Sequence, residues 1–79
     1  MSLLERYAKQ AYETKGLLHT RNIAILRNYI ATTPEEDIRN EISKITDIEL
    51  LRTLWEAGLN KRLQETALQR HAHLMTRRY

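Results

Sequence analysis

Cationic and polar side chains recur at helical spacing in the C-terminal part of this sequence. They are Arg62, Thr66, Arg70, His73 and Arg77, at intervals of four, four, three and four residues, and we call them the basic ridge. At about 100° per residue they fall within an arc of roughly 80° on one helix. Such a ridge predicts contact with anions, either an acidic protein surface or nucleic-acid phosphates. A solvated outer face near a helix C-terminus is the alternative interpretation.

Aromatic side chains and one histidine are the other residues that suggest binding. Tyr12 is expected at the edge of the apolar stripe of its helix, which makes it the candidate for an exposed partner contact. Trp55 falls on the apolar arc of a later helix, so we expect it in the core. His71 is expected to project into the apolar face of the last helix, with its ring against leucine side chains.

Catalytic and metal-binding chemistry finds no support in the sequence. There is no cysteine, which excludes disulfides, thiolate metal sites and thiol nucleophiles. His71 and His73 lie roughly 200° apart on a helix and cannot chelate one ion from one face, and His19 is expected in a loop. The acidic run Glu35–Asp37 occupies a first helical turn, where carboxylates complement the helix dipole or contact a basic partner. No phosphate loop or triad spacing occurs, so we predict no enzyme activity, no cofactor and no metal.

Composition and periodicity predict a single α-helical domain over residues 1–79. Val and Phe are absent, two Gly and one Pro leave few turn residues, and good helix formers dominate. The pattern predicts five helices: Leu3 to Lys15, Thr20 to Ala31, a third that begins at Thr33 and extends its apolar stripe to Ile45, a fourth from Thr46 or Asp47 to Gly58, and a fifth from Asn60 to about Arg77. Short loops predict that consecutive helices are antiparallel neighbours, in a compact five-helix bundle or a short helical stack.

Capping signals mark several of the expected helix ends. Ser2 is expected to cap the first helix, with Glu5 at capping-box spacing, and Thr33 to cap the third, with Pro34 in the first turn. Gly16 is expected just past the end of the first helix, where a left-handed residue closes a helix.

The second helix has an unusually wide apolar stripe. Its members are Ile23, Ile25, Leu26, Tyr29 and Ile30. A stripe that covers more than half of the cylinder predicts contacts on two sides and a central position in the bundle. The β-branched residues leave a short strand at residues 23–26 as an alternative, although no other segment could pair with it.

Residues 33–75 resemble helical repeats of the HEAT type. The segment Ile38-Arg39-x-x-Ile42-x-x-Ile45 is similar to the second helix of such a repeat, and Leu63-Gln64-x-x-Ala67-Leu68, 25 residues later, is similar to the next one. Between them, Thr46-Asp47-x-x-Leu50-Leu51-x-x-Leu54 is similar to the intervening first helix. The resemblance implies an antiparallel helical stack that binds other proteins without catalysis. Residues 1–32 do not follow the period and would act as a cap.

Charge alternates along the chain and predicts self-association. The net charge is +3 over residues 1–32, −4 over residues 33–58 and +4 over residues 59–79. The acidic middle could meet the basic ends of a second copy, which predicts a homodimer. No apolar run exceeds four residues and the N-terminus has no apolar signal region, so we expect no membrane span and a cytoplasmic location.

These patterns predict a small adaptor or regulator that binds an acidic partner protein through the basic ridge and Tyr12. Nucleic-acid binding through the same helix is the alternative from a different functional class. A helix-turn-helix around Gly58 is disfavoured, because Gln64 stands where that motif needs a buried apolar residue. Docking of the last helix on a membrane surface is a third possibility, but its apolar face is needed for the core.

Overall fold

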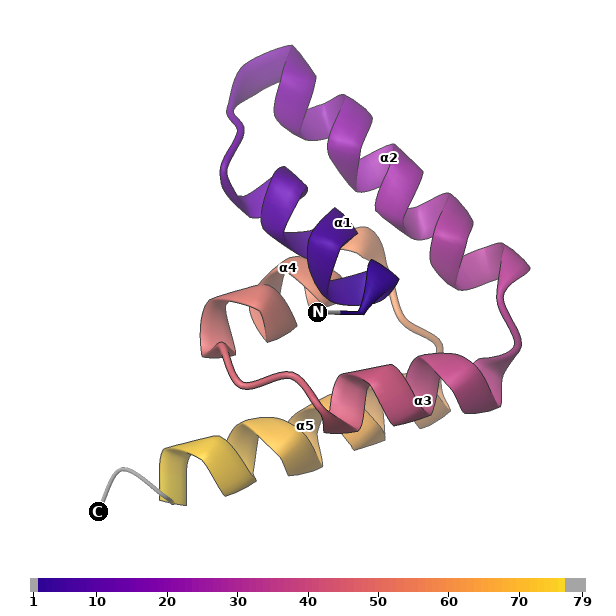
Figure 1. The fold of residues 1–79 in the computed structure, drawn as a ribbon, viewed down its shortest axis with the longest axis vertical. Helices are drawn as coiled ribbons and strands as arrows, with labels where there is room; N and C mark the ends of the chain where they lie inside the picture. The colour runs from indigo at the N-terminus through magenta and orange to yellow at the C-terminus, as the bar shows by residue number, and fades with distance from the viewer. Residues whose placement is uncertain (1, 77–79) are drawn as a thin grey trace.

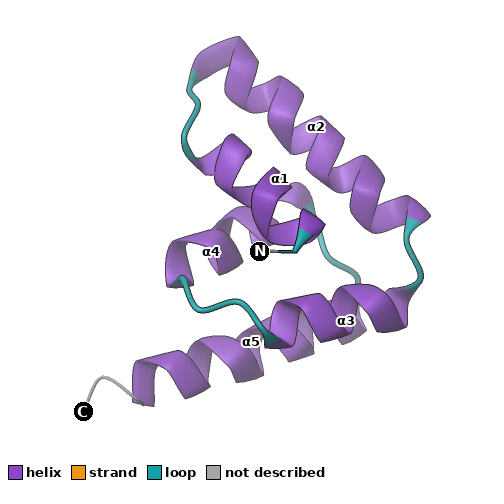
Figure 2. Cartoon of the chain, in the orientation of Figure 1, coloured by secondary structure: helices purple, strands orange, loops and turns teal. Residues whose placement is uncertain are grey.

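The computed structural model describes residues 2–76, which form five helices (Figure 1). In chain order they are α1 (Leu3–Tyr12), α2 (Gly16–Thr32), α3 (Glu35–Ser43), α4 (Ile48–Ala57) and α5 (Lys61–Thr76). Short loops connect them, and no strand occurs among the described residues (Figure 2). The all-α prediction is therefore confirmed, and residues 23–26, the segment with strand-like composition, are helical.

Side-chain caps begin three of the helices. Each capping oxygen accepts a hydrogen bond from a backbone N–H that the helix leaves unpaired, which contributes about 1 kcal/mol. The three bonds are Glu5 N to Ser2 Oγ at 3.2 Å, Glu49 N to Asp47 Oδ1 at 2.9 Å, and Leu63 N to Asn60 Oδ1 at 2.9 Å. At the other end of α4, Gly58 has a φ of 97°, in the left-handed region that favours glycine.

The boundary between the first two helices differs from the predicted one. α1 ends at Tyr12 rather than at Lys15, and α2 begins at Gly16 rather than at Thr20. Gly16 has a φ of 65°, so the chain reverses there and continues directly into α2. The earlier start places residues 16–19 on a helix instead of in a loop.

The helices do not all pack in chain order. α1 packs along α2 and also contacts α3 and α4, whereas α3 packs mainly against α5. Pro34, not Thr33, stands at the cap position of α3 and makes no side-chain cap bond. Thr33 is extended (φ −101°, ψ 141°), as proline requires of the residue before it, so α3 leaves α2 at an angle (Figure 1). Antiparallel neighbours therefore occur in the pairs α1/α2 and α4/α5, but α3 pairs with α5.

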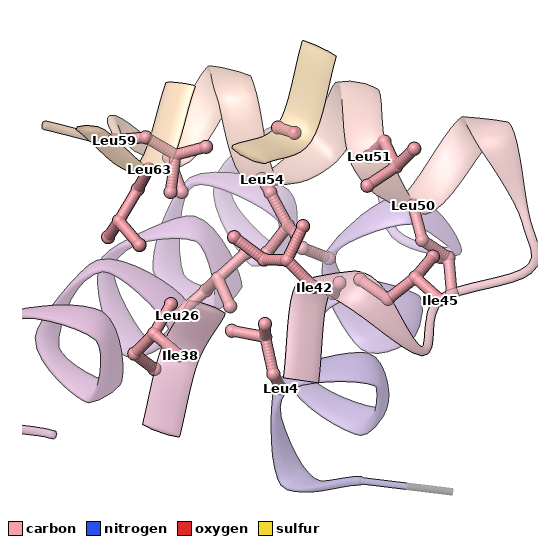
Figure 3. Packing of buried hydrophobic residues seen from close by; sticks show 14 of the residues in the cluster. Leu4, Leu26, Ile38, Ile42, Ile45, Leu50, Leu51, Leu54, Leu59 and Leu63 are labelled. Atoms are coloured by element: carbon pink, nitrogen blue, oxygen red, sulfur yellow. The ribbon is translucent and has the colours of Figure 1, made fainter. Parts of the chain in front are cut away.

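Every helix contributes to one hydrophobic core (Figure 3). The largest side chains that are almost completely buried are Leu4, Leu26, Ile38, Ile42, Ile45, Leu54 and Leu63. The predicted isoleucine stripe of α3 is thus confirmed, with Ile45 following in the α3–α4 loop. Burying each such side chain stabilises the fold by about 1.5–3 kcal/mol before conformational entropy is counted.

α2 lies at the edge of this core and not at its centre. Only Ile23 and Leu26 of α2 are buried, whereas Ile25 is 40% exposed and Leu17 is 91% exposed. The helix has 17 residues against 10 in α1, and its first turns extend beyond α1 (Figure 1). The prediction of a central second helix was wrong because neighbours cover only one side of its wide stripe. α1 and α4 each pack closely against three other helices, whereas α2 does so against two.

Candidate protein-interaction surface

The basic ridge lies along the edge of α5 that packs beside α3. Near the start of α5, Arg62 Nε is 3.5 Å from Glu35 Oε2. Further along, Arg70 Nε donates a hydrogen bond to the backbone carbonyl of Ile45 at 2.7 Å. Thr66 lies between them and donates its hydroxyl to the Arg62 carbonyl at 3.2 Å. Two of the ridge arginines therefore have partners within the molecule.

Arg70 fixes the loop that follows the C-terminal end of α3. α3 ends at Ser43 with Lys44 at the cap position, and the Ile45 carbonyl that follows accepts from the partly buried Arg70. This contact is a charge-assisted hydrogen bond, so Arg70 has a structural role. No local signal in the sequence reveals it, because the partner lies 25 residues away.

The other end of α3 is joined to α5 through Glu35. Its carboxylate accepts a hydrogen bond from Asn60 Nδ2 at 2.6 Å and faces Arg62 at 3.5 Å. The Arg62 side chain is 76% exposed, so this ion pair is weak and the guanidinium remains accessible to a partner. Among the other ridge residues, His73 is exposed, whereas Arg77 lies outside the described residues.

An apolar groove lies on the other side of α5, where this helix meets α4. We call it the α4/α5 groove, and it is lined by Leu51, Arg52, Trp55, Ala67, Leu68 and His71. Its volume is about 140 Å³. Leu68 precedes Arg70 by two residues, which places it roughly 160° around the helix from that ridge position. The ridge and the groove are therefore separate surfaces of one helix.

Trp55 stands on the wall of this groove and is 43% exposed. The preceding residue, Leu54, is fully buried, and one residue further along the helix is a rotation of about 100°. The prediction of a core tryptophan was therefore wrong. On α5, Leu68 and Met75 are also exposed, at 57% and 38%. His71 is partly buried at the groove, which it lines together with two leucines.

The charge around the groove is positive. Arg52 on α4 and His71 on α5 are the ionisable side chains among the six that line it, and none of the six carries a carboxylate. Arg52 lies 3.8 Å from Glu49, and the two side chains are 69% and 46% exposed, so that pair is weak. Glu56, next to Trp55 in the sequence, contacts His19 instead. The groove thus combines an apolar lining with a guanidinium group from α4 and an imidazole group from α5.

His19 joins three helices and was not identified from the sequence. It lies in α2, not in a loop, and its Nδ1 is 2.6 Å from the carbonyl of Ala11 near the end of α1. Its Nε2 is 3.1 Å from a carboxylate oxygen of Glu56 on α4. Both ring nitrogens face oxygen acceptors, so both bonds form only when the imidazole is doubly protonated. The Glu56 carboxylate, followed by the Ala11 carbonyl, raises the pKa of His19 above the ordinary value of 6.5.

Tyr12 lies on a different surface from the groove. Its side chain is 49% exposed and lines a depression between the α1 region and the start of α4, together with residues that include Glu13 and Asp47. This depression shares no lining residue with the α4/α5 groove. The structure therefore does not bring Tyr12 together with the groove.

Comparisons with known proteins leave geometry and charge as the guide to function. No model of a known protein family, no curated protein and no solved structure matches this chain. Within residues 2–76, no helix is long and apolar enough to cross a membrane. The same residues contain no group of three His, Asp or Glu side chains that could hold a metal ion.

Proposed function

We propose that this chain is a small, non-enzymatic interaction module of the cytoplasm that binds an acidic partner protein. The observation that carries the proposal is the α4/α5 groove, where Trp55 and Leu68 stay exposed beside a closed core. Tryptophan and arginine are enriched among the residues that dominate binding energy at protein interfaces. Trp55 and Arg52 both line this groove.

The basic ridge adds charge to the same helix. Arg62 and His73 are the exposed ridge residues among those described, and they are the ones that we propose to face a partner. Arg70 is left out because it is bound to the Ile45 carbonyl of the α3–α4 loop. Exposed charges at the rim of an interface change the association rate and its salt dependence more than the affinity.

The order of the last three helices supports the resemblance to HEAT-type repeats. α3 and α5 contain the two segments that resemble second helices of such repeats, and they pack against each other. They run in the same direction, and α4, which lies between them in the sequence, runs in the opposite direction (Figure 1). This order favours a protein-binding helical stack as the function of the chain.

Affinity capture with matched variants tests the proposal. Leu68→Glu places a charge in the groove, and Leu17→Glu makes the same change on α2, where Leu17 is 91% exposed. We expect the wild-type chain and Leu17→Glu to capture the same proteins and Leu68→Glu to lose them. Identical capture by all three chains would contradict the proposal.

Phosphate contact through α5 is the second candidate function. It rests on the exposed ridge residues Arg62 and His73. It stands second because the two ridge arginines described already face Glu35 and the Ile45 carbonyl. A labelled oligonucleotide titrated at two salt concentrations separates the candidates, since phosphate binding weakens steeply with salt. We expect no binding at physiological ionic strength.

A further inference from the structure

The size of the α4/α5 groove limits what can occupy it. Its volume of about 140 Å³ is too small for a helix and close to that of apolar cavities that take up a benzene-sized group. Leu51 and Trp55 form one wall, and Ala67 and Leu68 form the other. A single leucine, methionine or phenylalanine side chain matches this space and this lining.

The charge at the groove indicates what should surround that apolar side chain. Arg52 and His71 lie on the two helices that border the groove, and no carboxylate lines it. Arg52 has only a long, exposed contact with Glu49, so its guanidinium is free to take a stronger acceptor. Arginine binds carboxylates through paired, charge-assisted hydrogen bonds, which fixes geometry as well as adding affinity.

A second copy of this chain is a poor match for the same groove. Outside the groove, the most exposed leucines are Leu17 and Leu18 on α2, at 91% and 54% exposure. They are flanked in the sequence by Lys15 and Arg21, which have the same sign of charge as Arg52. Two grooves placed face to face would likewise bring cationic side chains together. Like charges at an interface oppose association.

We propose that the α4/α5 groove holds one large apolar side chain of a partner protein segment in which carboxylates flank that side chain. The proposal rests on the proposed function and specifies the partner of the same site. The apolar side chain packs between Trp55 and Leu68, and a neighbouring carboxylate pairs with Arg52. The partner is thus recognised by a short acidic segment with a single apolar anchor.

Trp55 provides a direct readout, because it is the only tryptophan in the chain and lines the groove. The probe is a short synthetic peptide with one phenylalanine flanked by glutamates. A twin peptide with lysines in place of the glutamates tests charge, and one with alanine in place of the phenylalanine tests the anchor. We expect a saturable blue shift of Trp55 fluorescence, with the glutamate peptide binding about tenfold more tightly than either control.

Variants of the groove connect the signal to the proposed contacts. We expect Arg52→Glu to lower the affinity for the glutamate peptide about tenfold and to raise the affinity for the lysine peptide. Leu68→Glu should abolish the fluorescence shift with both peptides. Both side chains are largely exposed, and an unchanged circular dichroism spectrum confirms that the variants fold. Leu17→Glu serves as the control and should bind as the wild type does.

Three results would overturn the proposal. The first is equal affinity for the glutamate and lysine peptides, and the second is no shift of Trp55 fluorescence with any peptide. The third is a fluorescence shift without peptide in samples whose sedimentation mass is that of two chains. If peptides fail but Leu68→Glu still loses the captured proteins, the groove binds a partner of other chemistry and only this inference fails. If capture is also unaffected by Leu68→Glu, the proposed function fails as well.

Discussion

The two edges of α5 differ in how many of their side chains find partners within the folded molecule. On the edge toward α3, Arg62 and Arg70 find oxygen partners in the molecule. On the edge toward α4, Trp55 and Leu68 remain exposed in an apolar groove. The Glu35 carboxylate and the Ile45 carbonyl pair with these charged side chains, whereas the uncovered apolar groove has no such internal partner. An apolar groove left uncovered after folding therefore indicates a binding surface better than a row of arginines does.

Truncation of buried and groove leucines should give the largest contrast between core and binding surface. Leu54 is fully buried on α4, so Leu54→Ala should lower the free energy of unfolding by about 2–5 kcal/mol. Leu68→Ala, in the groove, should change it by less than about 0.5 kcal/mol while weakening the binding of the glutamate peptide. Urea unfolding followed by circular dichroism measures both effects. A comparable loss in the two variants would show that Leu68 belongs to the core.

The structural role of Arg70 predicts the next largest effect. Arg70→Ala removes a charged donor and leaves the Ile45 carbonyl in the α3–α4 loop without this hydrogen bond. Hydrogen bonds to charged groups contribute about 1.5–3 kcal/mol, and we expect a loss of stability near the lower end of this range. Arg21→Ala on the exposed surface of α2 is the matched control. If both variants unfold at the same urea concentration, the Arg70 contact with the α3–α4 loop does not stabilise the fold.

Periodicity predicted most of the helices and the centre of the core, but not the surface that stays open. The Ile38, Ile42 and Ile45 stripe follows directly from helical spacing, and each of the three is fully buried. Spacing alone cannot locate Trp55, because its exposure depends on how far α5 covers the edge of α4. The contact between Arg70 and the Ile45 carbonyl joins positions far apart in the sequence, so it depends on the pairing of α3 with α5.

The His19 contacts with Glu56 and the Ala11 carbonyl form a third region, whose stability should depend on pH. Its pKa is raised by the Glu56 carboxylate and the Ala11 carbonyl, so the folded state holds the proton more tightly than the unfolded state does. This contribution to stability is complete below the ordinary value of 6.5 and disappears as pH rises through the raised pKa. Urea unfolding should therefore show decreasing stability as pH rises in that window.

His19→Gln should flatten this pH dependence. His73→Gln, which changes a histidine exposed on α5, should retain it. If the stability of the His19→Gln variant falls with pH as steeply as that of the wild type, another group causes the pH dependence.

Arg62 should have the smallest effect on stability, and it separates the two roles of the ridge most sharply. Its ion pair with Glu35 is 3.5 Å long and its side chain is 76% exposed, so Arg62→Ala should cost less than about 0.5 kcal/mol. Added salt should reduce even this difference, because exposed charges are screened. If Arg62 faces an acidic partner, the same change slows association with that partner, as stopped-flow measurements would detect. If Arg62→Ala instead lowers stability as much as Arg70→Ala does, both ridge arginines serve mainly to hold α3 and α5 together.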